Sequence, residues 1–332
     1  MYAVMPASLL SAKQLRGWIF RCPISFSLFR VPYPKGKNGT LLLRLRCLSV
    51  YLSVCPSVCH QAVSHEPPTR SWPVFLIESN LYLYLPGGNA TGIDEYPWAV
   101  VIEYSLNGAQ GMAVACGGAL ISGKYVLTAA HCINAWLKAS VVRLGEYDIV
   151  NEGQDCIHAS GGGMDCTEGA TRIKIEKTIP HPNYIFGKSK RHDIGLIRMR
   201  ETAPYTDFIR PICLPSKDLT RPENTPPYFS MYAVGWGATE NSTYSNVKLD
   251  VNVPFVNLEV SNRDGQLCAG GIENQDSCKG DSGGPLVYEN DHKFELIGVV
   301  SFGPDPCGDK GTPGIYSNVH HYLDWIKSVI VA

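Results

Sequence analysis

The sequence begins with a long stretch that lacks negative charge. No aspartate or glutamate occurs before Glu66, whereas lysine and arginine recur from Lys13 to Arg46. Over all 332 residues the formal net charge is nevertheless only −1. A near-neutral chain does not have the positive excess of a general nucleic-acid binder, so we expect no nucleic-acid partner.

The sequence also lacks a long uninterrupted apolar run. The apolar segment Cys47–Cys59 contains Pro56 and is too short to span a bilayer, so we expect no membrane partner. The segment Tyr2–Leu10 contains Pro6 and has no basic start, so no clear signal peptide is visible. Residues 1–84 are left unassigned, because a disordered leader, a transit peptide or a wrong gene start would each give such a segment.

Paired cysteine motifs of the kind that bind zinc are absent, although the chain has 12 cysteines. This number is high for a cytosolic enzyme, and disulfides in an oxidising compartment explain it better. Three Asn-x-Ser/Thr triplets, at Asn38, Asn89 and Asn241, agree with a secreted glycoprotein, although such triplets also arise by chance. We therefore expect an extracellular, secreted protein.

From Leu85 onward, short β-type runs alternate with glycine, proline, asparagine and aspartate. Many short strands at such spacing predict an all-β sandwich or barrel. At the end of the chain Tyr322, Trp325, Ile326 and Val329 recur at helical spacing, which predicts an amphipathic helix packed on the body. The predicted strands are Trp98–Tyr104, Gly118–Ile121, Tyr125–Thr128, Val141–Leu144, Ile194–Met199, Met231–Val234, Val247–Val256, Glu295–Ser301 and Gly314–Val319.

Three segments carry residue types that together can perform nucleophilic catalysis. His131 lies in VLTAAHC, Asp193 in HDIGLI and Ser282 in GDSGGP. A serine hydroxyl is a weak nucleophile at neutral pH and needs an adjacent base, which a carboxylate can orient. Alone, each segment has an ordinary structural interpretation: a core histidine, a turn aspartate and a glycine-rich turn. Together they follow the order His, Asp, Ser, which is that of the chymotrypsin arrangement.

These segments resemble the catalytic motifs of trypsin-like serine proteases, and the resemblance covers about residues 85–332. It implies a chymotrypsin-like all-β fold of two six-stranded antiparallel β-barrels with a C-terminal helix. It also implies that His131 is the general base, that Asp193 orients it, and that Ser282 is the nucleophile. The backbone N–H groups of Gly280 and Ser282 would hold the developing oxyanion.

The resemblance extends to the residues that select the substrate. The sixth residue before the nucleophile lies at the base of the specificity pocket in this family, and here it is Asp276. A buried carboxylate attracts a cationic side chain, so the resemblance implies cleavage of protein substrates after Arg or Lys. Four further substrate-binding residues follow from it, two as small pocket walls and the others in the strand that pairs with substrate: Ser301, Phe302, Gly303 and Gly314.

The resemblance also implies pairings for some of the cysteines. It implies Cys116–Cys132 beneath His131 and Cys278–Cys307 beside the pocket, and a local bridge Cys156–Cys166 is consistent with the glycine-rich loop between those residues. That loop and the segment Arg210–Pro215 resemble arthropod clip-domain proteases of zymogen cascades. The partner of Cys213 stays open, and no clip domain is recognised in residues 1–84.

The sequence departs from the family at the activation site. Relatives are cleaved after Arg or Lys, and the freed amine pairs with the aspartate beside the nucleophile, here Asp281. The aligned stretch begins at Leu85, and no basic residue lies between Arg70 and Leu85. An Asp281 without its cationic partner would leave the oxyanion loop unformed. A second departure is the short segment Val253–Gln266, in which the cysteine that relatives pair with Cys268 is missing.

No cofactor is expected, with one exception left open. The loop after Glu146 either binds Ca²⁺, as in some relatives, or is an acidic surface loop. A metal site built on His131 or His192 has little support, because no second histidine lies at ligand spacing around His131.

The sequence thus favours a secreted serine endopeptidase that activates a zymogen in an extracellular cascade, with cascade proteases and serpin-type inhibitors as partners. The alternative is a non-catalytic or non-activatable homologue that binds or regulates other proteins.

Overall fold

The structure is a computed structural model, and it describes residues 88–105, 112–133, 138–159, 161–185, 187, 190–239, 242–257, 265–290 and 292–330. The unassigned leader, the activation stretch before Gly88, and the asparagines Asn38 and Asn241 of two triplets lie outside these residues. So does most of the short segment that follows Val256. No helix among the described residues is long and apolar enough to cross a membrane.

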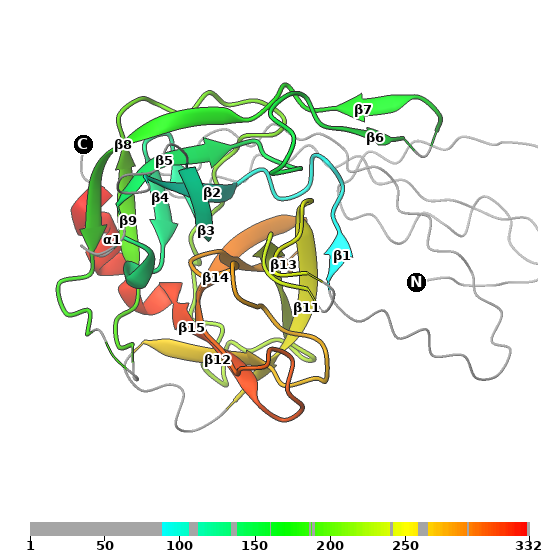
Figure 1. The fold of residues 1–332 in the computed structure, drawn as a ribbon. Coiled ribbons are helices and arrows are strands. Elements are labelled where there is room, and N and C mark those ends of the chain that lie inside the picture. Colours follow the sequence, from blue (N-terminus) through cyan, green and yellow to red (C-terminus); the bar gives the residue numbers. More distant parts are fainter. Residues whose placement is uncertain are drawn as a thin grey trace, which may run out of the picture. The chain divides into compact units, whose positions relative to one another are not determined.

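Six antiparallel strands close the first barrel in the order β2-β3-β4-β9-β8-β5 (Figure 1). Both faces of β2 are buried, because its inward residues fill the barrel and its outward residues are covered by other parts of the protein; Val100, Val101 and Ile102 are almost fully buried. Apolar residues without polar alternation are typical of such strands. The strand bounds are β2 Ala99–Ser105, β3 Met112–Ser122, β4 Tyr125–Thr128, β5 Ala139–Leu144, β8 Thr171–Pro180 and β9 Gly195–Met199.

The second barrel closes through a pairing between strands that are distant in the sheet. The sheet order is β1-β11-β10-β13-β14-β15-β12, and β11 also pairs with β12, at Phe255↔Ala269 and Val256↔Cys268. Six strands therefore form a closed barrel, to which β1 adds along the edge of β11. Bounds are β1 Asn89–Ala90, β10 Ser230–Gly235, β11 Leu249–Val256, β12 Gln266–Gly270, β13 Pro285–Asn290, β14 Lys293–Phe302 and β15 Pro313–Asn318.

The two-barrel prediction is confirmed, and every predicted strand overlaps an observed one. The C-terminal helix is also present, but it is shorter than its apolar pattern indicates. A 3-10 turn, Val319–Tyr322, precedes α1, Leu323–Ile330, so Tyr322 lies before the α-helix. The sequence analysis missed β1, β6, β7, β8, β12 and β13. β8 was missed because its sequence TRIKIEKTIP contains four charged residues.

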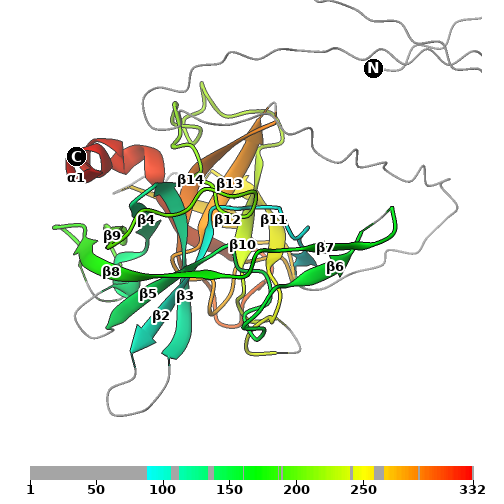
Figure 2. The same ribbon diagram turned by 90° about the horizontal axis from the view of Figure 1, so that it is seen from above.

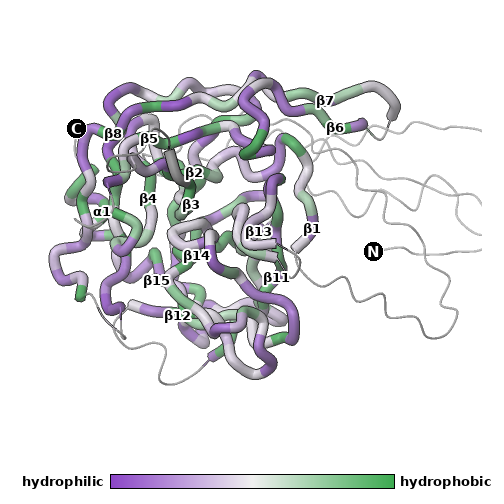
Figure 3. Tube along the Cα trace, viewed as in Figure 1, coloured by the Kyte–Doolittle hydropathy of each residue, from purple (hydrophilic) through white to green (hydrophobic). Residues whose placement is uncertain are grey.

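A disulfide-bonded hairpin stands apart from both barrels. Strands β6, Cys156–His158, and β7, Met164–Cys166, form their own two-stranded sheet and pair at Cys156↔Cys166. Figures 1 and 2 both show this hairpin projecting from the body of the protein. Figure 3 shows apolar residues concentrated on the barrel strands, whereas the connecting loops are largely hydrophilic.

Candidate active site

Two neighbouring strands of the first barrel bring His131 and Asp193 together. β4 and β9 are paired, with Thr128 opposite Gly195. His131 lies in the 3-10 turn Ala130–Cys132 that follows β4, and Asp193 lies two residues before β9. The His131 Nδ1 atom is 2.8 Å from Asp193 Oδ2, and the His131 backbone N–H donates to Asp193 Oδ1 at 2.9 Å. This carboxylate therefore fixes both the ring and the backbone of His131.

The second barrel holds Asp193 in place. Ser301 on β14 donates its Oγ proton to Asp193 Oδ2 at 2.5 Å, and Ser317 on β15 donates to the Asp193 carbonyl oxygen at 2.7 Å. All three residues are about 1% exposed. Ser301 was expected in the substrate strand, and its hydroxyl has this additional contact. Ser317 was missed, although a serine inside an otherwise apolar strand is a signal for a buried hydrogen bond.

The loop that carries Ser282 packs against the segment that carries His131. The Gly117 N–H on β3 donates to the Ser282 carbonyl oxygen at 2.8 Å. Gly283 has a φ of +79°, and a Cβ there would overlap Thr128 Oγ1, so only glycine permits this approach. In the described part of the chain no hydrogen bond joins the Ser282 and His131 side chains. In free enzymes such catalytic bonds are often long and tighten when substrate binds.

Two backbone N–H groups of the same loop are available to a substrate. Among the described residues, neither Gly280 nor Ser282 uses its N–H in an intramolecular hydrogen bond. The residue between them, Asp281, donates its N–H to the Cys278 carbonyl at 3.0 Å, which fixes the turn. Gly280 has a φ of +104°, and a Cβ there would lie 3.0 Å from Gly237 Cα. The two N–H groups that were expected to hold an oxyanion therefore lie in a turn that requires glycine.

Two of the expected glycines, Gly303 and Gly314, lie close to the Asp276 carboxylate. Its Oδ1 accepts the Ser277 N–H at 2.8 Å, whereas its Oδ2 is buried and has no hydrogen-bond partner in the described structure. A Cβ at Gly314 would lie 2.8 Å from Oδ1, and one at Gly303 would lie 3.7 Å from Oδ2. Burial raises the pKa of the Asp276 carboxyl to about 6, against the lowering effect of nearby backbone N–H groups. Such a carboxylate favours a cationic ligand, which would satisfy Oδ2 and lower the pKa again.

Asp281 points away from the substrate side, into the protein. Its Oδ1 accepts the Gly237 N–H at 2.7 Å and its Oδ2 accepts the Cys278 N–H at 2.9 Å. Within the described residues no salt bridge involves Asp281, and burial raises the pKa of its carboxyl to about 6. A cavity of about 480 Å³ adjoins the carboxylate, with residues of both barrels in its walls, among them Val101 and Trp236.

The comparisons with known proteins agree with this geometry. A family model described as Trypsin matches residues 85–326. The chain belongs to the trypsin family of serine proteases. A solved trypsin-family structure, titled crystal structure of drosophila Grass clip serine protease of Toll pathway, matches with a TM-score of 0.63 and 34% identity, covering 77% of this chain and 73% of that one.

Curated relatives place the chain among the clip-domain members of the trypsin family. It is 49% identical over 268 residues to the phenoloxidase-activating enzyme of Bombyx mori, covering 74% of this chain and 60% of that protein. It is 41% identical to the CLIP domain-containing serine protease HP8 of Bombyx mori, covering 82% and 76%. The chain therefore spans less than two thirds of the length of the first of these relatives.

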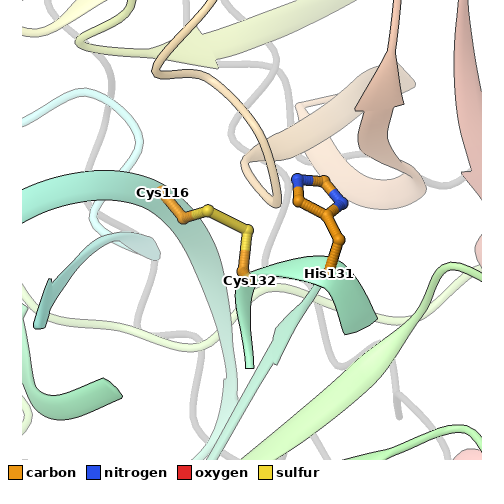
Figure 4. A group of neighbouring side chains, drawn as sticks. All are labelled: Cys116, His131 and Cys132. Carbon is orange, nitrogen blue, oxygen red and sulfur yellow. A yellow bond between two sulfur atoms is a disulfide. The ribbon is translucent and has the colours of Figure 1, made fainter. Parts of the chain in front are cut away.

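Among the described residues, three disulfides connect loops and strands of the two barrels and the hairpin. They join Cys116 to Cys132, Cys156 to Cys166 and Cys278 to Cys307, which are the three pairings expected from the sequence. Figure 4 shows the first of them beside His131, a grouping that resembles a metal-binding cluster of one histidine and two cysteines. The two sulfur atoms are bonded to each other at 2.05 Å, so they are not thiolate ligands.

Aromatic stacking connects the C-terminal helix of the protease to the Asp193 segment. The His192 ring stacks on His181 at a centroid distance of 5.1 Å, and its Nδ1 lies 3.2 Å from the Tyr322 hydroxyl. Trp325 of α1 packs edge-on against His181 at 4.9 Å. Burial and the neighbouring His192 lower the pKa of His181 to about 4, so the His181 ring is uncharged at neutral pH.

Lys190 lies beside the strand that was expected to pair with substrate, and the sequence analysis did not single it out. Its Nζ donates to the Ser301 carbonyl oxygen at 3.4 Å and lies 5.6 Å from the centre of the Phe302 ring. A cation over an aromatic ring is attracted to it. No motif marks such a residue, because its position depends on a loop of the other barrel.

The partly buried Asp281 predicts an unusual dependence of stability on pH. Its folded-state pKa of about 6 lies above the ordinary value of 3.8. Between pH 3.8 and 6 the folded state therefore binds more protons than the unfolded state. The contribution of this carboxyl group to the unfolding free energy is therefore fully present below pH 4, and it is lost as the pH rises through 6. We expect the uncleaved full chain to lose about 2–3 kcal/mol of unfolding free energy between pH 4 and 7 relative to an Asp281→Asn variant.

Urea denaturation at each pH measures this difference. An Asp207→Asn variant is the matched control, since Asp207 forms only an exposed ion pair with Arg210. If the unfolding free energies of the wild type and Asp281→Asn changed with pH in the same way, ionisation of Asp281 would not destabilise the folded state, and the prediction would be wrong.

Proposed function

We propose that this protein is a secreted serine endopeptidase that cleaves proteins after arginine or lysine. The observation that carries the proposal is the buried Asp276 carboxylate, whose Oδ2 has no partner among the described residues, six residues before Ser282. A substrate guanidinium or ammonium would fill this vacancy with a charge-assisted hydrogen bond. The 2.8 Å contact between His131 and Asp193 supports the catalytic half of the proposal.

Each residue has one task in the reaction. His131 accepts the Ser282 proton as Ser282 Oγ attacks the substrate carbonyl, and it then gives the proton to the leaving amine. Asp193 keeps the imidazole in the required tautomer and stabilises its cation. The N–H groups of Gly280 and Ser282 hold the oxyanion, and losing one such donor typically costs about 10²-fold or more in rate. Water then hydrolyses the acyl-enzyme by the same route.

The setting of the reaction is proposed from three features. Three disulfides support an oxidising, extracellular environment. Asn89, of the second Asn-x-Ser/Thr triplet, is exposed on β1. The similarity to a phenoloxidase-activating enzyme supports a role as a zymogen activator in a cascade, with serpin-type inhibitors as further partners. The protease domain is proposed to comprise residues 85–332.

The test uses the full chain carrying Tyr84→Arg, which places a basic residue directly before Leu85. After cleavage by immobilised trypsin and removal of the trypsin, we expect kcat/KM for an Arg-amide to exceed that for a matched Phe-amide by at least about 10²-fold. The same variant carrying Ser282→Ala, treated identically, controls for residual trypsin. Turnover that is absent, or unchanged in the Ser282→Ala variant, would overturn the proposal.

A second function is favoured by one observation. No basic residue lies between Arg70 and Leu85, so a trypsin-like activator has no site at which to free Leu85. A non-catalytic regulator that keeps the protease fold would have this property. Against it, His131, Asp193 and Ser282 are all present. An inactive Tyr84→Arg variant would favour this second function.

A further inference from the structure

The loop after Glu146 was expected either to bind Ca²⁺ or to be an acidic surface loop. Residues 150–154 are exposed, but an arginine is buried at the base of the loop. The guanidinium of Arg143, at the end of β5, lies inside the loop. Only 6% of the Arg143 side chain is exposed, and the side chains of its partners Glu103 and Glu146 are 3% and 1% exposed. An arginine so deeply buried needs a full set of partners.

Arg143 has such a set. Its Nη2 lies 2.6 Å from Glu103 Oε1 and its Nε donates to the same oxygen at 2.8 Å. Its Nη1 donates to Glu146 Oε2 at 2.7 Å and to the Ile149 carbonyl at 3.1 Å. The guanidinium therefore joins β2, β5 and the loop at a single point, as a bound cation would.

The other oxygens of the loop are also occupied by donors. Glu146 Oε1 accepts the Tyr147 N–H at 2.9 Å. Asp155 accepts the Asp148 N–H at 3.0 Å on Oδ2 and the Asn151 side-chain amide at 2.7 Å on Oδ1. Ca²⁺ requires 6–8 oxygen ligands at about 2.3–2.6 Å. The residues present do not fit Ca²⁺, because the oxygens that face inward already accept hydrogen bonds.

The loop has its own cations, which offset most of its negative charge but not all of it. Arg172 on β8 lies 3.1 Å from Glu103 and 2.7 Å from Glu152, so two arginines face three carboxylates. Burial raises the pKa of Glu146 to about 7, and the adjacent Arg143 opposes this rise. A calcium ion entering the loop would place two positive charges beside the buried Arg143 and would have to displace it.

We propose that the Arg143 guanidinium takes the place of a calcium ion in this loop, and that the folded protein does not require Ca²⁺. The loop borders the cavity next to Asp281 through Ile149 and Val150. Its internal arginine therefore keeps this side of the site ordered whatever the calcium concentration. This proposal concerns folding, so it stands apart from the proposed protease activity.

The test is the melting temperature of the full-length chain in millimolar CaCl₂ and in excess EDTA. We expect the two Tm values of the wild type to agree within about 1 °C. A Tm that rises by several degrees with Ca²⁺, and loses that rise in a Glu146→Gln variant, would overturn the proposal.

The replacement itself is tested by removing the arginine. Arg143→Met leaves the buried Glu146 without its cation and leaves Glu103 with Arg172 alone, so we expect Tm to fall by about 10 °C and Ca²⁺ to restore part of it. An Arg143→Lys variant keeps the positive charge but lacks the planar guanidinium. Its Tm should fall less than that of Arg143→Met, and Ca²⁺ should raise its Tm less. The matched control is Arg210→Met, since Arg210 pairs only with the exposed Asp207. If Arg143→Met folds but ignores Ca²⁺, or if Arg143→Lys matches the wild type, the guanidinium is not a substitute for the ion.

Discussion

A Ser282→Ala variant of the activated protein hydrolyses an Arg-amide with kcat at least about 10⁴-fold below that of the parent, and its KM changes little. Alanine removes the nucleophile but leaves the Asp276 pocket and the N–H groups of the loop. Residues that act as one catalytic unit lose most of the rate when any one of them is removed. Initial rates per mole of purified, cleaved protein, measured in the Tyr84→Arg background, give the comparison.

A His131→Ala variant sharpens this prediction. If Ser282 and His131 act together, the double variant should be about as slow as either single variant rather than slower by the product of the two effects. His292→Ala is the matched control, because the His292 side chain is 84% exposed and its ion-pair partner is Glu289. Multiplicative losses would show that the two residues do not form one catalytic unit.

The second large effect concerns the pocket. Replacing Asp276 by serine removes the only carboxylate that the described structure places against the glycine walls Gly303 and Gly314. We expect kcat/KM for Arg- and Lys-amides to fall by about 10³-fold, because truncating one member of a buried charged pair costs about 2–5 kcal/mol. Turnover of a Phe-amide should change by less than about tenfold, since no charge is lost there.

A panel of amides that differ only at the cleaved residue measures this effect. Asp305→Ser is the matched control: Asp305 lies in the neighbouring loop, but its carboxylate is exposed and pairs with Lys279. Equal losses on charged and apolar substrates would mean that Asp276 supports the structure of the loop rather than the selection of substrate.

The sequence was sufficient for the two-barrel fold because its evidence is local. Short apolar runs separated by turn residues predicted most strands, and the motifs around His131 and Ser282 predicted which loops matter. The strand β12 was missed because its five residues follow a segment that appeared truncated, and β13 because its start overlaps the nucleophile motif. Local patterns do not distinguish such strands from loops.

The supports of the site could not be predicted, because they depend on contacts between distant parts of the chain. Ser317 binds a carbonyl 124 residues away, and Arg143 finds Glu103 across 40 residues. Side-chain identity alone does not indicate such partners: a serine in a strand or an arginine beside a loop is ordinarily a surface residue. Which of these side chains are buried depends on how each barrel closes and on how the two barrels pack against each other.

The contribution of both barrels to one site has a consequence for how the protein can be inhibited. His131 and Asp193 belong to the first barrel, whereas Ser282 and the hydroxyls of Ser301 and Ser317 belong to the second. Misplacement of catalytic groups by about 1 Å can cost about 10²-fold in rate. A molecule that separates the two barrels slightly would therefore abolish turnover. It would do so without unfolding either barrel and without occupying the substrate pocket. Loss of activity in this protein would then be an early and sensitive sign of movement between its two halves, before any loss of secondary structure.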